Sequence, residues 1–269
     1  MVTLNSHQHR EVIALIPAAG QATRISPLPC SKELYPIGFR SDKNRAIKPK
    51  VVCHYLLENM RLAGIKKAYF LLRSGKWDIP AYLGDGEILD MNLGYLVVRW
   101  LYGVPYTLDT AYPFVKDAIV ALGYPDILFQ PEDSYKRILT HLYSSSADIV
   151  LGAVNFANPQ KGNMIVFDTD GRVLHMVEKP DHSDSHYSWC TAVWTPVFTE
   201  FLHEYLKKIE STSDNLAQQR EIPFGDIVRA AMEHGLRVEA EVLPEGGYLD
   251  IGTPNDLIKA VTHFAVQEV

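Results

Sequence analysis

Cysteine is scarce in this sequence of 269 residues, and its pattern speaks against two classes of protein. The three cysteines, Cys30, Cys53 and Cys190, lie far apart and show no CxxC spacing. A disulfide framework needs paired cysteines, and a cysteine-based zinc site needs them close together. We therefore expect neither, and a reducing cytoplasm is the compartment that fits this composition.

Long apolar runs and an excess of positive charge are missing as well. No stretch approaches the roughly 20 apolar residues of a bilayer-spanning helix, and the polar first ten residues do not resemble a secretory signal. The formal net charge of -6 gives no global attraction for nucleic acid or for an anionic membrane. We expect neither partner, so any bound phosphate must be held by a local cluster of cations and amides.

Apolar residues make up 47% of the chain and charged residues 22%, which is enough for a full hydrophobic core. Buried strands are predicted at the apolar runs 12–16, 68–72, 94–99, 118–122 and 147–154. Helical spacing at 49–63, 109–117 and 131–143 separates several of these runs. This alternation predicts an α/β fold, a mostly parallel sheet with helices on both faces and ligands at the carboxyl ends of its strands.

The second half of the chain departs from this alternation. Runs at 164–167 and 173–177 flank a turn at 168–171, which predicts a β-hairpin. Strands are expected at 189–194 and 237–243, helices at 196–209, 222–233 and 253–264, and a polar loop at 211–220. Because no linker separates independent units, we expect one domain over residues 1–269, with halves of about 11–155 and 156–269.

A loop of small and polar residues directly follows the first predicted strand. It consists of Ala18, Ala19, Gly20, Gln21, Ala22 and Thr23. Small side chains let backbone amides approach an anion, and Arg24 and Lys32 would add charge-assisted hydrogen bonds to phosphate oxygens. Taken alone, the same composition is equally typical of a tight strand-to-helix turn.

Two carboxylates stand next to predicted elements in a way that suits a metal ion. Asp126 follows the strand at 118–122, and Asp250 precedes the last helix. Mg²⁺ prefers oxygen ligands and usually takes one or two carboxylates together with substrate phosphates. The alternatives are that Asp126 is an ordinary turn residue and that Asp250 orients the turn into the helix.

Three ordered segments resemble the opening motifs of the sugar-1-phosphate nucleotidyltransferases. They are Leu-Ile-Pro-Ala-Ala-Gly-Gln-Ala-Thr-Arg at 15–24, Ser-Lys-Glu-Leu-Tyr-Pro-Ile at 31–37, and Lys48-Pro49. The Ser-Lys form is most similar to the glucose-1-phosphate thymidylyltransferase branch. The resemblance implies a Rossmann-like mixed sheet with a hairpin-containing sugar-binding portion. It also implies a Mg²⁺-dependent enzyme that joins a nucleoside triphosphate to a sugar-1-phosphate and releases pyrophosphate.

The resemblance assigns the first half, about 11–155, to nucleotide binding. It implies that Arg24 and Lys32 act catalytically on the reacting phosphates, and that the loop 18–23 and Glu33 bind the nucleotide. The segment Gly-Tyr-Pro-Asp at 123–126 resembles the family's L-G-D motif, which implies a metal-binding role for Asp126. The segment Tyr-Leu-Asp at 248–250 resembles the W-L-D or W-V-D motif, which implies the same role for Asp250.

The second half, about 156–269, would bind the acceptor. Val-Glu-Lys-Pro at 177–180 resembles the family's E-E-K-P segment. By this resemblance Glu178 accepts hydrogen bonds from sugar hydroxyls, Lys179 binds the sugar phosphate and takes part in catalysis, and Gly162 passes close to the sugar. An ordinary surface ion pair between Glu178 and Lys179 is the alternative.

Several segments depart from the family pattern. Ala22 stands where the family has its second glycine, Tyr124 and Pro125 intervene before Asp126, and the family's V-T-G-x-Y segment is replaced by Trp-Cys-Thr-Ala-Val-Trp at 189–194. The base-reading glutamine is absent too. Two alternatives therefore stay open: a non-sugar acceptor such as phosphocholine, a phosphonate or a cyclitol phosphate, and a catalytically silent nucleotide-sugar-binding regulatory protein. Whether the chain forms a homo-oligomer is open as well.

Overall fold

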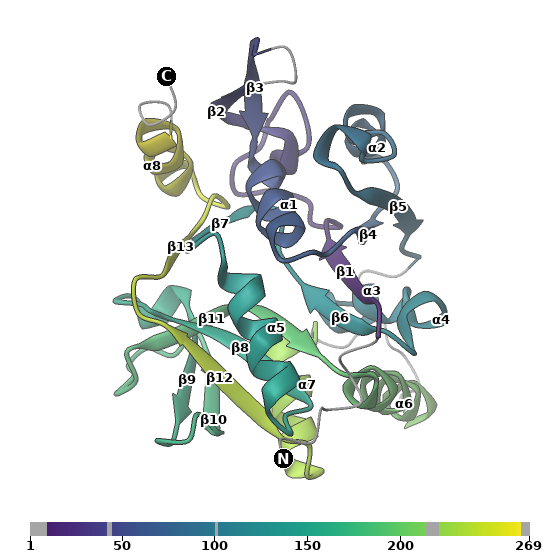
Figure 1. Ribbon diagram of the computed structural model, residues 1–269, viewed down its shortest axis with the longest axis vertical. Coiled ribbons are helices and arrows are strands. Elements are labelled where there is room, and N and C mark those ends of the chain that lie inside the picture. The colour runs from purple at the N-terminus through teal and green to yellow at the C-terminus, as the bar shows by residue number, and fades with distance from the viewer. Residues whose placement is uncertain (1–9, 42–44, 100–101, 213–220, 265–269) are drawn as a thin grey trace.

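A mixed nine-stranded sheet forms the centre of the computed structural model, which describes residues 10–41, 45–99, 102–212 and 221–264 (Figure 1). Its first part is parallel: β1 pairs with β4 and β6, and β4 pairs with β5. These strands are β1 (Val12–Pro17), β4 (Lys67–Leu72), β5 (Asn92–Val97) and β6 (Ile119–Leu122). Strands β1 and β6 are almost entirely apolar because helices cover the sheet on both faces.

The second part of the sheet is largely antiparallel and is organised by one long strand. Strand β11 (Tyr187–Trp194) pairs antiparallel with β6, β8 (Ile149–Asn155) and β9 (Asn163–Phe167). Strand β12 (Val238–Leu243) lies parallel to β8. Strand β10 (Val173–Glu178) completes the hairpin with β9, as expected from the turn at 168–171. The prediction of a Rossmann-like mixed sheet is thereby confirmed.

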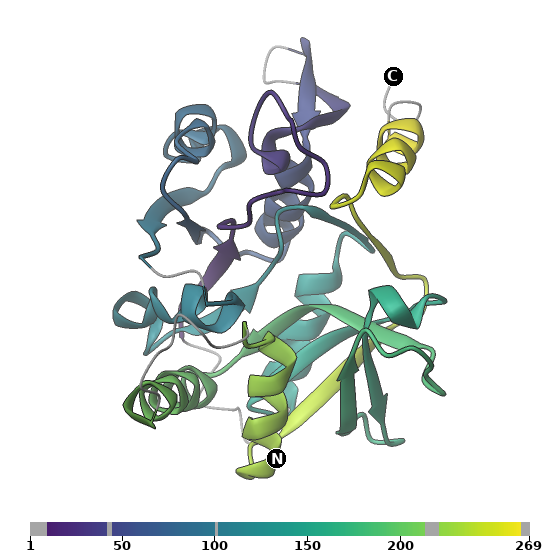
Figure 2. The same cartoon turned by 180° about the vertical axis from the view of Figure 1, so that it is seen from behind.

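Helices cover both faces and divide the core into two layers (Figures 1 and 2). One face carries α1 (Val52–Leu62), α2 (Asp78–Leu83) and α5 (Ser134–Ser144). The other carries α3 (Val104–Asp109), α4 (Tyr112–Val115), α6 (Pro196–Thr212) and α7 (Phe224–Glu233). None of the helices in the described part of the chain has both the length and the apolar character that a membrane crossing needs.

Two predicted helices differ from the structure for identifiable reasons. The helix expected at 49–63 begins only at Val52, because β3 (Ile47–Val51) forms an antiparallel ladder with β2 (Pro36–Ser41). The helix expected at 109–117 is split into α3 and α4. Pro113 has no N–H to donate to the carbonyl of Asp109, so a continuous helix would lose a backbone hydrogen bond at that point.

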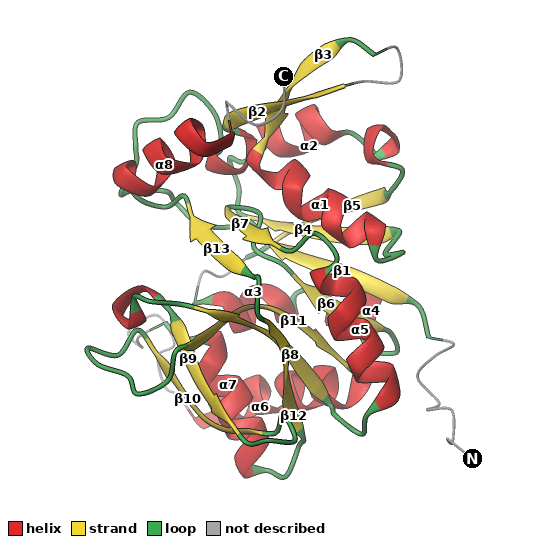
Figure 3. Cartoon of the chain, turned by 60° about the vertical axis from the view of Figure 1, so that its left-hand side comes forward, coloured by secondary structure: helices red, strands yellow, loops and turns green. Residues whose placement is uncertain are grey.

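A second short ladder was also not expected from the sequence. Strand β13 (Gly247–Asp250) pairs antiparallel with β7 (Ile127–Gln130), and the following helix α8 (Pro254–Phe264) packs beside β2 (Figure 3). A small core cluster that includes Ile37, Leu128 and Ile251 holds these segments together. Both strands end in a polar residue, and neither is a continuous apolar run like the equally short β6, so the sequence pattern did not mark them. Of the loop expected at 211–220, residues 213–220 lie outside the described residues.

One polar cluster joins helix α5 to strand β12, with which it is in contact. The Nδ1 atom of His141 lies 2.7 Å from a carboxylate oxygen of Glu241, and its Nε2 atom lies 2.6 Å from one of Glu239. Glu239 also accepts a hydrogen bond from Arg237. Burial lowers the pKa of His141, but the hydrogen bonds and charges of the two carboxylates outweigh burial and raise this pKa overall.

The raised pKa of His141 predicts a pH-dependent stability. The protonated ring should stabilise the folded protein fully below the ordinary histidine pKa of about 6.5, and this contribution should fade as pH rises through the higher folded-state pKa. Chemical denaturation should show that His141→Gln is less stable than wild type by on the order of 1 kcal/mol at about pH 6, with the gap shrinking towards about pH 9. Glu241→Gln should reproduce part of this pH dependence. A gap that is constant with pH would contradict the assignment.

Candidate active site

The candidate site forms where three neighbouring parallel strands end. Strands β1, β4 and β6 run in the same direction, so their carboxyl ends lie at one edge of the sheet. The loop 18–24 follows β1, Lys76 follows β4, and Asp126 follows β6. The topology therefore brings residues from distant parts of the chain to the edge where ligands bind in such sheets.

The loop after β1 lines a cavity of about 520 Å³. Ala19, Gly20, Gln21 and Thr23 face this cavity together with Lys32. Ala18 is buried instead, and its N–H donates to the carbonyl of Leu71 at 2.9 Å. Of the residues predicted to bind nucleotide, Ala18 and Ala22 are thus not among those that line it.

Ala22 shapes the loop through its backbone. Its φ of 55° lies in the left-handed region that glycine adopts readily and alanine adopts at a cost of about 1–2 kcal/mol. The carbonyl of Ala22 accepts the N–H of Ile25 at 3.1 Å and the hydroxyl of Ser26 at 3.0 Å. Glycine, which the resembled family has at this position, adopts such a φ without strain. Ala22 adopts the same backbone conformation although it carries an extra methyl group.

Lys32 and Asp126 form an ion pair at the centre of the site. Lys32 opens the short helix η1 (Lys32–Leu34), and its ammonium contacts the carboxylate of Asp126. Their side chains are only 13% and 17% exposed. Burial lowers the pKa of Lys32, but the charge and hydrogen bond of Asp126 outweigh burial and raise this pKa overall, which keeps the ammonium charged.

Asp250 is brought to the same place by the β7–β13 ladder. It pairs with Ile127, and the N–H of Ile251 donates to the carbonyl of Asp126 at 3.2 Å. The carboxylate of Asp250 accepts the N–H of Gly252 at 2.7 Å. Burial and the nearby negative charge of Asp126 raise the pKa of Asp250, although the Gly252 hydrogen bond and two cations act in the opposite direction.

Arg24 lies beside Asp250. A methyl group placed on Gly252 would come within 2.7 Å of the Arg24 Nη2 atom and 2.8 Å of the Asp250 Oδ1 atom. A side chain at position 252 would therefore crowd both the guanidinium of Arg24 and the carboxylate of Asp250. Arg24, Lys32, Asp126 and Asp250 are thus brought together, as the sequence motifs predict.

The two aspartates offer oxygen ligands of the kind that Mg²⁺ prefers. Asp126 and Asp250 are close enough for one carboxylate to raise the pKa of the other. In the described part of the chain, no group of three or more His, Cys, Asp or Glu side chains gathers to hold a metal. A cation between the two aspartates would then complete its shell with phosphate oxygens and water, which is the usual Mg²⁺ arrangement.

A second cavity, of about 580 Å³, adjoins the first at Asp126 and Tyr124, which line both. Asp250, Glu178 and Lys179 also line this second cavity. Its wall includes the aromatic side chains of Tyr124, Trp189, Phe224 and Tyr248. The two cavities and the two carboxylates form one continuous site at the sheet edge.

Glu178 and Lys179 stand at the end of β10, with the Lys179 ammonium 3.2 Å from the Glu178 carboxylate. Lys179 has a φ of 45°, and its N–H donates to the carbonyl of Gly162 at 2.8 Å. A left-handed backbone at a lysine costs free energy and often marks a functional position. Gly162 is not among the residues that line the cavity, and packs against Phe156 and Ser188 instead.

Glu33 forms a buried ion pair that the sequence did not reveal. Its carboxylate lies 2.6 Å from the ammonium of Lys76, and the two residues are 1% and 4% exposed. The second carboxylate oxygen of Glu33, Oε2, has no hydrogen-bond partner among the described residues. Glu33 is also one of the residues that line the first cavity. The only sequence signal for Lys76 is its position after a buried strand, because Ser-Gly-Lys at 74–76 otherwise resembles a surface turn.

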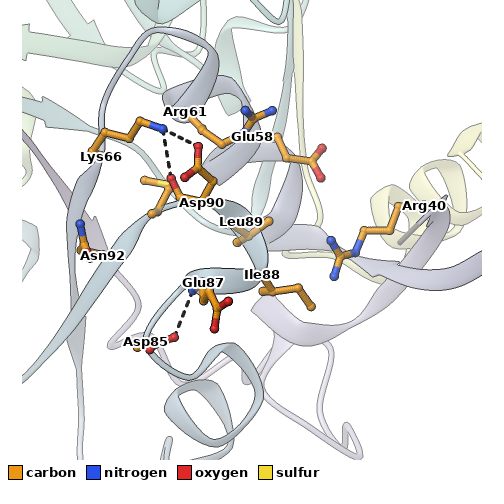
Figure 4. A pocket seen from close by; sticks show the side chains of 11 residues that line it. Arg40, Glu58, Arg61, Lys66, Asp85, Glu87, Ile88, Leu89, Asp90 and Asn92 are labelled. Carbon is orange, nitrogen blue, oxygen red and sulfur yellow. Dashed lines mark hydrogen bonds and ion pairs between the residues drawn. The ribbon is translucent and has the colours of Figure 1, made fainter. Parts of the chain in front are cut away.

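Cavity size alone does not identify the site. A larger cavity of about 860 Å³ lies between β2, α1 and the segment at 85–92 (Figure 4). It is lined by Arg40, Glu58, Arg61 and the Lys66–Asp90 ion pair, among others. None of the residues singled out by the sequence motifs lines it.

A family model described as nucleotidyl transferase matches residues 13–267. A low-salt glycan biosynthesis nucleotidyltransferase of Haloferax volcanii is 23% identical over 246 residues, and a glucose-1-phosphate thymidylyltransferase of Streptomyces antibioticus is 24% identical over 250 residues. The alignments cover 90% and 91% of this chain but only 63% and 64% of those relatives. This chain therefore spans less than two thirds of their length.

The fold also matches a solved structure. A UDP-glucose pyrophosphorylase complexed with UDP-glucose superposes with a TM-score of 0.74 at 20% identity, covering 94% of this chain and 98% of that one. At this level of identity the likeness shows a shared fold.

The Glu33–Lys76 pair predicts a strong coupling in stability. Lys76→Met should lower the free energy of unfolding by about 3–5 kcal/mol, because it leaves a buried carboxylate without its counter-charge. Adding Glu33→Gln should recover most of this loss, since no buried charge then remains. Denaturant titration of the single and double variants measures both effects.

The exposed Lys66–Asp90 pair provides the control. Lys66→Met should change stability by less than about 1 kcal/mol. If the double variant is as unstable as Lys76→Met alone, the loss does not come from the unpaired carboxylate.

Proposed function

This chain belongs to the nucleotidyl transferase family, and we propose that it transfers a nucleotidyl group from a nucleoside triphosphate to a sugar-1-phosphate with release of pyrophosphate. The observation that carries the proposal is the position of Lys32, Asp126 and Asp250 around two adjoining cavities, with Arg24 beside Asp250 although it lines neither cavity. The nucleotidyltransferase and thymidylyltransferase relatives support the reaction class. A structure of the same fold in complex with UDP-glucose supports a nucleotide sugar as the product.

The two cavities suggest how the substrates divide between them. The triphosphate occupies the first cavity, where the amides of Ala19, Gly20 and Gln21 and the ammonium of Lys32 face its phosphates. The sugar-1-phosphate occupies the second cavity, beside Glu178 and Lys179. Asp126 lines both cavities, so the bond forms at their junction.

The reaction is an in-line displacement. An oxygen of the sugar phosphate attacks the α-phosphorus, the bond to the β-phosphate breaks, and pyrophosphate leaves with the electron pair. The attacking phosphate is already ionised at neutral pH, so no general base is required. Catalysis then consists of positioning and charge neutralisation. Arg24 stabilises the triphosphate and the leaving pyrophosphate, Lys32 contacts phosphate at the reacting centre, and Lys179 holds the nucleophile.

Mg²⁺ fits the carboxylate pair, and Asp126 and Asp250 would hold it. When bound, the ion neutralises charge on the phosphate oxygens. Burial, followed by the charge of Asp126, raises the pKa of Asp250, and a cation between the two carboxylates would act against this rise.

The direct test is a matrix of nucleoside triphosphates against phosphorylated acceptors, with pyrophosphate release as the readout in the presence of Mg²⁺. We expect turnover with a sugar-1-phosphate, and a severe loss of turnover in Arg24→Ala with an unchanged melting temperature. Turnover only with phosphocholine or another non-sugar acceptor would reject the proposed acceptor. Ligand binding without turnover for any pair would indicate a silent binding protein.

The Asp250→Asn variant should affect pyrophosphate release and the melting temperature differently. This change removes a carboxylate whose pKa is raised by burial and by Asp126, so the melting temperature should stay the same or rise. Pyrophosphate release should fall on the order of 100-fold, because a metal ligand is lost. Asp170→Asn, at an exposed hairpin turn, should leave both quantities unchanged. A variant with normal turnover would remove Asp250 from the metal site.

A further inference from the structure

Tyr124 and Pro125, which intervene between Gly123 and Asp126 where the resembled family has no residues, form a turn. The carbonyl of Tyr124 accepts the N–H of Ile127 at 3.2 Å, which closes a four-residue turn with Pro125 as its second residue. Proline favours that position because its ring fixes φ. The turn leads from β6 into β7 and has Asp126 as its third residue. The insertion therefore forms the turn that carries this proposed metal ligand.

The side chain of Tyr124 lies on the wall that the two cavities of the site share. The described residues that line both cavities are Gly103, Val104, Tyr124, Asp126 and Glu221. Glycine and valine offer no polar side-chain atom, and the two carboxylates accept hydrogen bonds when they are ionised. Among the described residues of this shared wall, the hydroxyl of Tyr124 is therefore the side-chain group that can donate a hydrogen bond without carrying a charge.

The hydroxyl of Tyr124 makes no hydrogen bond within the described part of the chain. It is also not one of the buried polar atoms that lack a partner, so this oxygen is accessible to an occupant of the cavities that Tyr124 lines. Two other tyrosines near the site differ. The hydroxyl of Tyr135 donates to the carbonyl of Leu122 at 2.7 Å, and that of Tyr248 lies 2.9 Å from the hydroxyl of Ser188. Their hydroxyls are used within the protein, and that of Tyr124 is left for a ligand.

The charges around Tyr124 show where its phenol group lies. Burial raises the pKa of Tyr124, and the negative charges of Asp126 and then Glu178 raise it further. A carboxylate acts on a phenol in this way only from nearby. Both carboxylates line the second cavity, and Asp126 also lines the first. The phenol group is thus close to the proposed metal ligand and to the proposed acceptor-binding residue.

We infer that the hydroxyl of Tyr124 donates a hydrogen bond to a non-bridging oxygen of the α-phosphate, the phosphate that is transferred, and is a catalytic residue. This inference rests on the proposed function, in which the triphosphate lies in the first cavity and the acceptor in the second. The phosphorus that comes to join them then lies at the wall that both cavities share.

The hydrogen bond moves no proton. The acceptor oxygen forms its bond to the α-phosphorus, the bond to the β-phosphate breaks, and pyrophosphate leaves with the electron pair, while Tyr124 keeps its proton throughout. A donor fixed at the reacting phosphate stabilises the charge on its oxygens as the displacement proceeds.

Tyr124→Phe removes this hydroxyl and keeps the aromatic ring on the shared wall. The kcat for pyrophosphate release should fall on the order of 10–100-fold, because one donor at the reacting phosphate is lost. The melting temperature should not change, since the hydroxyl has no partner among the described residues. An unchanged kcat would show that Tyr124 serves only as an aromatic wall and would overturn the inference.

Sulfur substitution tests whether the α-phosphate is the partner. In the two stereoisomers of an α-thio triphosphate, sulfur replaces one or the other non-bridging oxygen and accepts hydrogen bonds poorly. With one stereoisomer, Tyr124→Phe should reduce kcat much less than it does with the oxygen substrate, because the two changes remove the same hydrogen bond. An equal reduction with the oxygen substrate and with both stereoisomers would contradict the contact.

Tyr135→Phe is the matched control at the other side of the end of β6. It removes the hydrogen bond to the carbonyl of Leu122 and should lower the melting temperature, but it should leave kcat and the response to sulfur intact. If Tyr135→Phe reduces kcat as much as Tyr124→Phe does, the effect comes from loosened packing, and the assignment of Tyr124 fails.

Binding of an uncleavable triphosphate separates this inference from the proposed reaction. Calorimetric titration with the α,β-methylene analogues of UTP and dTTP in Mg²⁺ should give a Kd about 10-fold weaker for Tyr124→Phe than for wild type. Weaker binding by this variant, with no pyrophosphate release by wild type, would support the contact and reject the reaction. Release by wild type, with equal Kd and equal kcat in the variant, would reject the contact and support the reaction. The absence of both binding and release would reject both.

Discussion

Two carboxylates that repel each other, Asp126 and Asp250, are the constraint around which this site is built. The β7–β13 ladder holds them together: Asp250 pairs with Ile127, and the backbone of Ile251 bonds to that of Asp126. Lys32 pairs with Asp126 and Arg24 lies beside Asp250, so two cations offset part of the repulsion. Backbone pairing thus maintains an electrostatically unfavourable arrangement, as is common where a site is prepared for a ligand.

A buried ion pair and the two cavities lie next to the two aspartates. Directly after Lys32, the buried Glu33–Lys76 pair ties the start of η1 to the segment after β4. The two cavities adjoin at Asp126. The loop after β1 lines one of them, and residues of β10, β11 and α7 line the other. Because these elements belong to one sheet and its covering helices, the proposed substrates would be held against a packed core rather than on loops alone.

Much of the fold and of the candidate site could be predicted from the sequence, and the failures share a cause. Buried strands such as β1 and β6 have strong local apolar patterns, and the loop after β1 and the Lys32 segment carry ordered motifs. Strands β7 and β13 are four residues each and become strands only by pairing across more than a hundred residues of sequence. Lys76 and the unpaired indole of Trp189 were missed because ion pairing and hydrogen-bond satisfaction depend on neighbours that are distant in sequence.

By itself, the sequence determined the class of fold and the chemical groups available. Apolar runs select a covered sheet, and the type and order of Arg24, Lys32, Asp126 and Asp250 predict phosphate and metal chemistry. Only the tertiary structure decided which of these groups meet. It placed Asp250 near Asp126, buried Glu33 against Lys76, and left the buried N–H of Trp189 without a partner among the described residues while pairing that of Trp194. The physical reason is that periodicity is a local property, whereas charge neutralisation and hydrogen-bond satisfaction are fixed by contacts formed when the sheet assembles.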